Sequence, residues 1–382
     1  MAVDGWSSPT NEPVIGISIT CKSRTSLIDT IDTTGHHHTI PYMTETTLNG
    51  IQKAEETFDV KVRHVVTDGA ANMTGMREAI RSQRDDVIAY HCQPHLLNLL
   101  AKDIKQAQTE TINKVLSVVK FFRNKHDASA SLKAANISRP PVPAETRWNT
   151  MSDTLEYYCV NWAVLVELIS DLQGTNGVER KFLENIQIRN AACDLRDIFS
   201  AVSKALNTLQ RDGATIGQAV EVWLDLLHTI DGLQNPEIRE FAKKRCQEML
   251  KDHCFLAANL LDPRYLGERL NPAQIRNAIK FIKSINPDVE QSLTQFVAKT
   301  SPYDMDSLGK NIEPGVWWVA GKRIGFDMHL CNVALGLVTG VANSAGLERQ
   351  FSTMRITYGT LRTRLSVEKA GKLAFCFRSL NG

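Results

Sequence analysis

Strand-like and helix-like segments alternate over the first 91 residues, and this order restricts the folds that the chain can adopt. Two segments are rich in β-branched residues and bounded by proline or glycine, as antiparallel strands are, and two are short apolar runs typical of buried parallel strands. In chain order these segments are residues 14–18, 25–33, 62–67 and 87–91. Apolar residues at three- and four-residue spacing predict helices over residues 44–58 and 73–83.

With a further strand at Asp4, the predicted order is three strands, a helix, a strand, a helix and a strand. This is the order of a ribonuclease-H-like core, an α/β fold built on a mixed sheet. The topology places Asp4 on the first strand and Asp68 at the carboxyl end of the fourth strand. The two aspartates are therefore predicted to be neighbours in the sheet.

The rest of the chain is mostly helical, above all between residues 155 and 311. Helical spacing of apolar residues covers residues 96–123, 182–209, 216–233, 236–258 and 272–285. A chain of 382 residues also exceeds the roughly 250–300 residues that one hydrophobic core supports. We therefore expect either two domains or one domain with a large insertion.

Three acidic residues at the ends of separate elements form a candidate site: Asp4, Asp68 and Glu348. A nuclease-like site needs such a set to hold two divalent cations about 4 Å apart. Each acid also has an ordinary structural interpretation. Asp68 could cap the following helix, Asp4 could be a turn residue, and Glu348 could be an exposed helix residue. It is their occurrence as an ordered set that favours a site.

Several sequence blocks occur in an order that resembles the catalytic domain of hAT-family transposases. The blocks are residues 4–8, 65–73, 90–99, 146–149, 260–265, 317–318, 344–352 and 361–366. The stretch from residue 317 to residue 366 resembles that family's C-terminal dimerisation region. Most of the chain is covered by the resemblance, so chance agreement of a single motif does not explain it.

The resemblance implies a ribonuclease-H-like core that is interrupted by a large all-α insertion. On this basis we expect the first part of the core over residues 1–157, the helical insertion over residues 158–315, and the completed core with the dimerisation region over residues 316–382. The helix near Ser344 would bring Glu348 back to the two aspartates.

The activity implied by the resemblance is cut-and-paste DNA transposition through phosphoryl transfer by a DDE transposase. Asp4, Asp68 and Glu348 would hold two Mg²⁺ or Mn²⁺ ions as a DDE triad. The implied partners are DNA, as transposon ends and as target, and further copies of the chain in a homodimer or higher oligomer. A nuclear location follows from such a role.

The resemblance also points to residues that handle DNA: Cys92, His95, Arg147, Trp148 and Arg349. Cys92 and His95 have the separation of half a zinc site, and they could equally be a buried cysteine and a helix-capping histidine. In the family, a tryptophan in the position of Trp148 stacks on a base displaced during hairpin formation, a contact worth ~1–3 kcal/mol. An ordinary core tryptophan is the alternative.

The chain departs from the family's pattern at its beginning, where only three residues precede Asp4 and no zinc finger is present. End-specific DNA recognition is therefore in doubt. The alternative hypothesis is a truncated or domesticated transposase-derived protein that dimerises or associates with DNA without catalytic activity.

Charge and cysteine content restrict the environment of the chain only loosely. The net charge is +2, which neither requires nor excludes a nucleic-acid partner, although residues 348–382 carry seven Lys or Arg against two Glu. This basic segment could be one wall of a phosphate-binding surface or a solvated helix face. The eight cysteines lack Cys-x-x-Cys spacing and favour a reduced intracellular compartment. No apolar run reaches the ~18 residues that span a membrane.

Two further motifs are interpreted as structural. The tract from His36 to His38 follows Gly35 and is predicted to be a polar loop and not a metal site. Trp317 and Trp318 are predicted to pack in the interior where the insertion meets the core.

Overall fold

The computed structural model of the chain describes residues 1–8, 11–21, 24–143, 149–172, 177–233, 235–303, 312–358 and 367–381. Packing divides the chain into two compact units. The core unit comprises Met1–Leu96, Thr208–Val222 and Gln247–Gly382, and the helical unit comprises Leu97–Asn207 and Trp223–Cys246.

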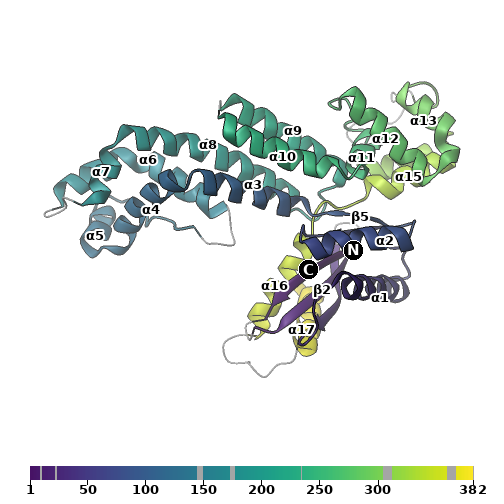
Figure 1. Ribbon diagram of the computed structural model, residues 1–382, viewed down its shortest axis with the longest axis horizontal. Helices are drawn as coiled ribbons and strands as arrows, with labels where there is room; N and C mark the ends of the chain where they lie inside the picture. Colours follow the sequence, from purple (N-terminus) through teal and green to yellow (C-terminus); the bar gives the residue numbers. More distant parts are fainter. Residues whose placement is uncertain are drawn as a thin grey trace. The chain divides into compact units, whose positions relative to one another are not determined.

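The core unit contains a five-stranded mixed sheet (Figure 1). Its strands are β1 (Ala2–Ser7), β2 (Pro13–Cys21), β3 (Arg24–Asp32), β4 (His64–Thr67) and β5 (Ile88–His91). The order across the sheet is β3-β2-β1-β4-β5, with β1 antiparallel to β2, β2 antiparallel to β3, and the pairs β1–β4 and β4–β5 parallel. The predicted ribonuclease-H-like α/β arrangement is therefore confirmed.

Helices cover both faces of this sheet. Successive residues of a strand point to opposite faces, so neighbouring residues of β2 contact different helices. On one face, Ile17 of β2 packs against Gly50 of α1 (Ile40–Phe58), and α2 (Ala71–Gln83) lies beside α1. On the other face, Gly16 of β2 packs under α16 (Ala345–Tyr358), and Gly371 of α17 (Val367–Asn381) packs on Thr30 of β3. Figure 1 shows these helix pairs on either side of the strands.

The interior between the sheet, α1 and α2 is apolar. Its fully buried members include Val3, Ile15, Ile17, Met43, Ile51, Val65, Met76, Ile80 and Ala89. Burial of a side chain of this size contributes about 1.5–3 kcal/mol to stability. Since these residues come from four strands and two helices, they fix the sheet and its helices as one unit.

Further helices of the core unit lie after residue 247 in the chain. They are α11 (Cys254–Leu261), α12 (Pro272–Ile285), the 3-10 helix η1 (Pro287–Val289), α13 (Glu290–Val297), α14 (Pro314–Gly321) and α15 (Met328–Val338). Trp317 and Trp318 of α14 are buried, and the Trp318 indole N–H donates to the Leu261 carbonyl at 2.8 Å. Their predicted role in packing is confirmed.

The helical unit contains α4 (Thr109–Asn124), α5 (His126–Ala134), α6 (Asn149–Asp171) and α7 (Val178–Glu184). It also contains most of α3 (Gln93–Ala107), α8 (Ile186–Leu209) and α10 (Pro236–Leu250), and part of α9 (Ile216–Gly232). Arg245 of α10 pairs with Asp103 of α3 through two bonds, at 2.8 and 3.1 Å.

Three long helices predicted from the sequence are each two helices in the structure. The predicted helix over 96–123 breaks between α3 and α4, where the Thr109 hydroxyl bonds to the carbonyls of Lys105 and Gln106. The one over 182–209 breaks at Asn185, whose side chain accepts the amide of Gln187. The one over 236–258 breaks between α10 and α11. Side chains that bond to nearby backbone groups compete with the helix and end it, which apolar spacing does not reveal.

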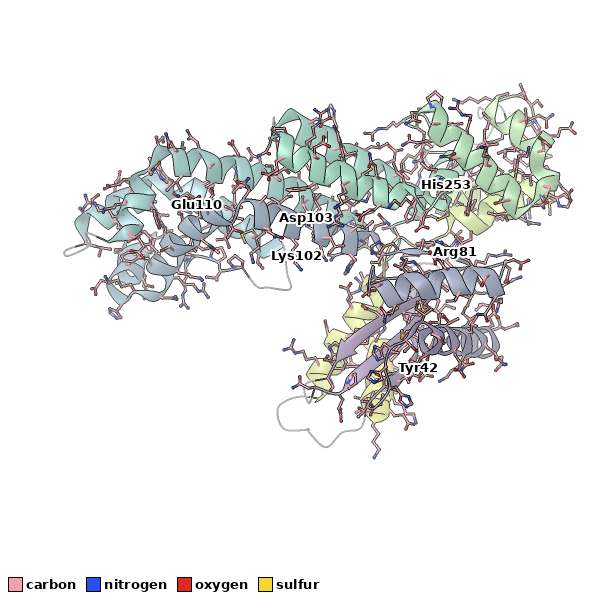
Figure 2. The ribbon with its side chains drawn as sticks, in the orientation of Figure 1. Tyr42, Arg81, Lys102, Asp103, Glu110 and His253 are labelled. Atoms are coloured by element: carbon pink, nitrogen blue, oxygen red, sulfur yellow. The ribbon has the colours of Figure 1, made fainter. Side chains whose placement is uncertain are left out.

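The histidine tract is a loop, as predicted. His36 and His38 flank the ring of Tyr42 on α1, at centroid distances of 5.2 and 6.4 Å, and Figure 2 labels Tyr42. No helix in the described ranges is long and apolar enough to cross a membrane. The domain boundaries expected at residues 157 and 315 stay a prediction, because units of packing need not coincide with inserted segments.

Candidate catalytic carboxylates

Asp4 lies in the middle of β1, the strand with neighbours on both sides at the centre of the sheet. It pairs with Gly16 of β2, and its Oδ1 accepts the Gly5 amide at 2.8 Å. The Asp4 side chain points to the face that α16 covers, because Val3 points into the opposite interior. Asp4 is half-buried there.

Asp68 directly follows β4, which runs parallel to β1, so it lies at the carboxyl end of the neighbouring strand. Its Oδ1 accepts the Ala70 amide at 3.0 Å. The N-cap residue of α2 is Ala70, so the interpretation of Asp68 as that helix's cap is wrong. Asp68 is held in place by Arg77, which donates to the Asp68 carbonyl at 2.6 Å and to the Thr67 hydroxyl at 2.7 Å.

Glu348 lies in the first turn of α16, on a helix that rests on β2. A Cβ at Gly16 would lie 2.5 Å from the Phe351 ring and 2.9 Å from Leu347, so α16 approaches the strand as closely as glycine permits. Phe351 also stacks on Trp6 of β1, with ring centroids 5.4 Å apart. These contacts hold Glu348 over the strand pair that carries Asp4.

The charges of Asp68 and Glu348 act on the carboxyl group of Asp4. Burial raises the pKa of Asp4 to about 7, and the negative charges of Asp68 and Glu348 add to this rise, against the hydrogen bond from Gly5. Much of Glu348 is exposed, but its carboxyl group is partly desolvated, which raises its pKa, and the charge of Arg349 opposes that rise. The charges of Asp68 and Glu348 therefore reach Asp4 in the folded chain, although 344 positions separate Asp4 from Glu348.

Three repelling carboxylates are the donor set that hard divalent cations prefer, so the chemistry of this site fits Mg²⁺ or Mn²⁺. The side chains of the three acids do not surround a common position for a metal ion. In the described part of the chain, no three His, Cys, Asp or Glu side chains lie close enough together to surround one ion. Coordination would therefore require these side chains to rotate inward, which is possible because Glu348 is exposed and both aspartates are only half-buried.

Cys92 and His95 have different surroundings from those of a zinc pair. The Cys92 thiol is buried and accepts a hydrogen bond from the Ser344 hydroxyl at 3.3 Å, and burial raises its pKa to about 11. Burial therefore favours the neutral form of this thiol. Since Ser344 immediately precedes α16, Cys92 helps to position the helix that carries Glu348. His95 lies near His91, with ring centroids 5.5 Å apart.

Two residues near the site were not identified in the sequence. The His91 ring packs so closely on Gly69, which follows Asp68, that a Cβ at Gly69 would lie 2.5 Å from it. Gly16 likewise lacks a Cβ where the Phe351 ring of α16 packs on it. A glycine inside a strand pattern is a signal of close backbone approach, and it could have indicated Gly16 before the structure was known.

Arg349, Arg147 and Trp148 are the remaining residues that were predicted to handle DNA. Arg349 forms an ion pair with Asp212 and donates to the Gln210 carbonyl at 3.2 Å, so it ties α16 to the segment before α9. Arg147 and Trp148 lie outside the described residues, as do Arg362 and Arg364 of the basic C-terminal segment.

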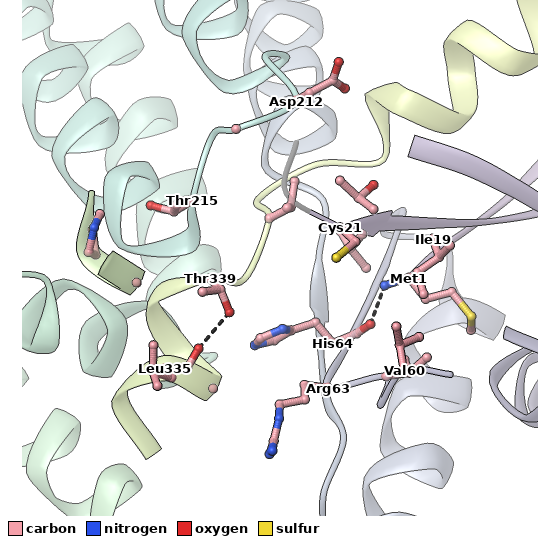
Figure 3. A pocket seen from close by; sticks show the side chains of 18 of the residues that line it. Met1, Ile19, Cys21, Val60, Arg63, His64, Asp212, Thr215, Leu335 and Thr339 are labelled. Atoms are coloured by element: carbon pink, nitrogen blue, oxygen red, sulfur yellow. Dashed lines mark hydrogen bonds between the residues drawn. The ribbon is translucent and has the colours of Figure 1, made fainter. Parts of the chain in front are cut away.

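A cavity of about 960 Å³ lies elsewhere in the core unit, at the amino ends of β1 and β4 (Figure 3). His64 lines it, and burial lowers the pKa of this histidine to about 3, so the ring is neutral at physiological pH. Asp68 follows the other end of β4, and neither it nor Asp4 nor Glu348 is among the lining residues. The cavity is therefore separate from the carboxylate site.

Comparison with known proteins concerns the first third of the chain. Residues 1–122 match the sequence model of a family described as a domain of unknown function, DUF659. That family is found in hAT-like, transposase-related proteins. Residues 1–122 therefore resemble a transposase-related domain. The matched segment includes Asp4, Asp68, Cys92 and His95, and it does not include Glu348. A search of curated proteins found no match.

Proposed function

We propose that this chain is an hAT-like transposase that cleaves and joins DNA strands through Asp4, Asp68 and Glu348. The observation that carries the proposal is the convergence of these acids, seen in the effect of the Asp68 and Glu348 charges on the pKa of Asp4. Structural carboxylates are commonly placed beside cations, whereas an acid whose pKa is raised to about 7 by burial and, to a smaller extent, by two neighbouring acids is typical of a functional site.

The residues of the chain have distinct roles in this proposal. Asp4 and Asp68 would be ligands on the rigid sheet, and Glu348 would be the ligand on α16. Two divalent cations bound there would activate water or a DNA 3′-hydroxyl and stabilise the leaving oxygen. The Gly5 and Ala70 amides orient the aspartate oxygens through hydrogen bonds of 2.8 and 3.0 Å. Arg77 fixes the backbone at Asp68 from the buried side.

DNA as the partner is supported by charge in the helical unit. Between residues 120 and 143, five cations stand against the single acid Asp127, and we call this region the α4–α5 basic surface. The cations are Lys120, Arg123, Lys125, Lys133 and Arg139. All are exposed except Arg123, which is half-buried. Phosphate backbones bind such surfaces by releasing counterions, and chromosomal DNA would place this activity in the nucleus.

Self-association is supported by the outer face of α17. Val367, Ala370, Gly371 and Ala374 are buried, so they form the inner stripe of this helix. Leu373, Phe375 and Phe377 remain 44%, 41% and 57% exposed. Leu373 and Phe377 lie one helical turn apart and together expose apolar surface on one side of α17, which is typical of protein interfaces, and a second copy of the chain is the partner that we propose.

A non-catalytic role is favoured by one observation. Among the described residues the acids are not gathered closely enough to surround an ion. The second candidate is therefore a domesticated transposase-derived protein that dimerises or associates with DNA and does not cleave it.

The test is cleavage of a labelled DNA duplex with Mn²⁺, together with metal binding by calorimetry. Wild type would be compared with Asp68→Asn and Glu348→Gln, and with Glu45→Gln as a matched control, because Glu45 is an exposed acid on α1. We expect cleavage and Mn²⁺ binding in wild type and in the control, and neither in the two site variants. Folded protein that binds no Mn²⁺ and cuts no DNA would favour the non-catalytic role.

A further inference from the structure

Helices α6 and α8 of the helical unit face each other along an antiparallel row of side-chain contacts. At one end, the guanidinium of Arg189 lies 4.8 Å from the ring centroid of Trp162. At the other end, Arg196 Nε lies 3.6 Å from a carboxylate oxygen of Glu156. Residue numbers fall along α6 as they rise along α8, so the two helices run in opposite directions.

Cys159 and Cys193 occupy the position between these two contacts. Cys159 lies three residues from both Trp162 and Glu156, and Cys193 lies four residues from Arg189 and three from Arg196. Residues at these spacings share one face of a helix. The two thiols are accordingly in hydrogen-bonding contact, and both cysteines are free. The flanking contacts on either side fix the register that brings them together.

The two thiols differ in access to solvent. Cys159 is buried, with 8% of its surface exposed, whereas Cys193 is half-buried and can be reached from outside. The Arg196 guanidinium lies near enough for both sulfur atoms to influence its pKa. Burial and the neighbouring Cys193 thiol nevertheless raise the pKa of Cys159 to about 12 against the charge of Arg196, so Cys159 is protonated in the reduced pair.

We propose that Cys159 and Cys193 are a modification site at which a low-molecular-weight disulfide, such as oxidised glutathione, forms a reversible bond between α6 and α8. This inference does not depend on the proposed function, because it concerns only the helical unit.

The proposed disulfide forms in two thiol–disulfide exchange steps, in which atoms and electrons balance. The Cys193 thiolate attacks one sulfur of oxidised glutathione, forms a mixed disulfide and releases one reduced glutathione. Cys159 then loses its proton and attacks the Cys193 sulfur, which forms the intramolecular disulfide and releases the second reduced glutathione. Both cysteines are oxidised and one glutathione disulfide is reduced. Cys193 is the first nucleophile because it is the accessible thiol.

The bond would close a loop of the chain that contains α7. A cross-link across a loop of this size stabilises mainly by restricting the unfolded chain. We expect the thermal midpoint of the oxidised protein to rise by roughly 5–10 °C above that of the reduced protein.

The experiment uses the full chain with Cys21→Ser and Cys376→Ser, which remove the exposed thiols outside the pair. The protein is incubated with oxidised glutathione, quenched with an alkylating agent, digested and analysed by mass spectrometry. We expect a cross-linked peptide pair that joins Cys159 to Cys193 and no glutathione on either. Cys246, a buried thiol of α10, should remain alkylatable after unfolding and serves as the internal control.

Single variants distinguish the two steps. In Cys159→Ser the first step should proceed and stop, so that Cys193 retains glutathione, and in Cys193→Ser neither position should be modified. The thermal midpoint should rise on oxidation only when both cysteines are present. Persistent glutathione on Cys193 with Cys159 intact, or no modification of either thiol, would overturn the proposal.

Discussion

The ring of Phe351 rests directly on Gly16, at a distance that leaves no room for a Cβ on that residue. Gly16 pairs with Asp4 in the sheet, and Phe351 is one helical turn from Glu348. The contact therefore sets how closely the helix that carries the third acid approaches the strand that carries the first.

Gly16→Ala should destabilise the core unit by about 1–3 kcal/mol, because the added methyl group would overlap the Phe351 ring and force it to move. Urea unfolding measures this change. Gly5→Ala is the matched control in the neighbouring strand, since nothing lies within 4 Å of a Cβ at that position. Equal stabilities of the two variants would mean that α16 is not seated on Gly16.

Asp4→Asn should stabilise the protein in a pH-dependent way. Asp4 has a pKa of about 7 in the folded protein, above its ordinary value near ~4, so the folded state binds the extra proton between these values. Wild-type stability therefore falls as the pH rises from 4 to 7, whereas the variant lacks this loss. The free energy of unfolding of Asp4→Asn should equal that of wild type below pH ~4. Above pH 7 it should be greater by about 2–3 kcal/mol, after solvent screening is considered.

Urea unfolding at several pH values follows this difference. Asp85→Asn, at an exposed aspartate outside the site, controls for a general effect of removing negative charge. A difference between Asp4→Asn and wild type that does not change with pH would show that Asp4 titrates normally.

Arg245→Met should destabilise the helical unit by about 1–3 kcal/mol. The side chains of Arg245 and Asp103 are only 16% and 26% exposed, so the variant leaves a partly buried carboxylate without the two bonds that Arg245 donates to it. Figure 2 labels Asp103 on α3. Lys243→Met is the control on the same helix, because the Lys243–Glu240 pair is exposed and should matter by less than ~0.5 kcal/mol. Denaturant midpoints compare the variants, and adding Asp103→Leu to Arg245→Met should recover part of the loss.

Lys120→Gln combined with Lys133→Gln should weaken DNA binding and its dependence on salt. If both lysines of the α4–α5 basic surface contact phosphates, the slope of log affinity against log salt should fall by about 2. Fluorescence anisotropy with a labelled duplex at several salt concentrations gives this slope. A control with Lys243→Gln and Lys244→Gln removes the same charge from α10. An equal fall in both double variants would assign the effect to net charge alone.

The sequence determined the order of elements and the type of fold, because strands and helices leave different periodicities in a chain. It determined where β2, β3, β4 and β5 lie to within a few residues, and it located Asp68 at the end of a strand. The interruptions at Thr109 and Asn185 were missed, since a bond between a side chain and a nearby backbone group does not alter the apolar spacing.

The tertiary structure alone decided which distant residues share a site. Apolar periodicity gives the inner face of α16 without stating which strand that face meets, and a resemblance suggests a partner for Glu348 without giving its distance. The close fit of Phe351 on Gly16 determines that α16 packs on β2, because the Phe351 ring fits only where the strand has a residue without a side chain. Burial decided the chemistry of Cys92 and Asp4, since desolvation raises the pKa of a thiol or a carboxyl only when the folded chain removes the surrounding water.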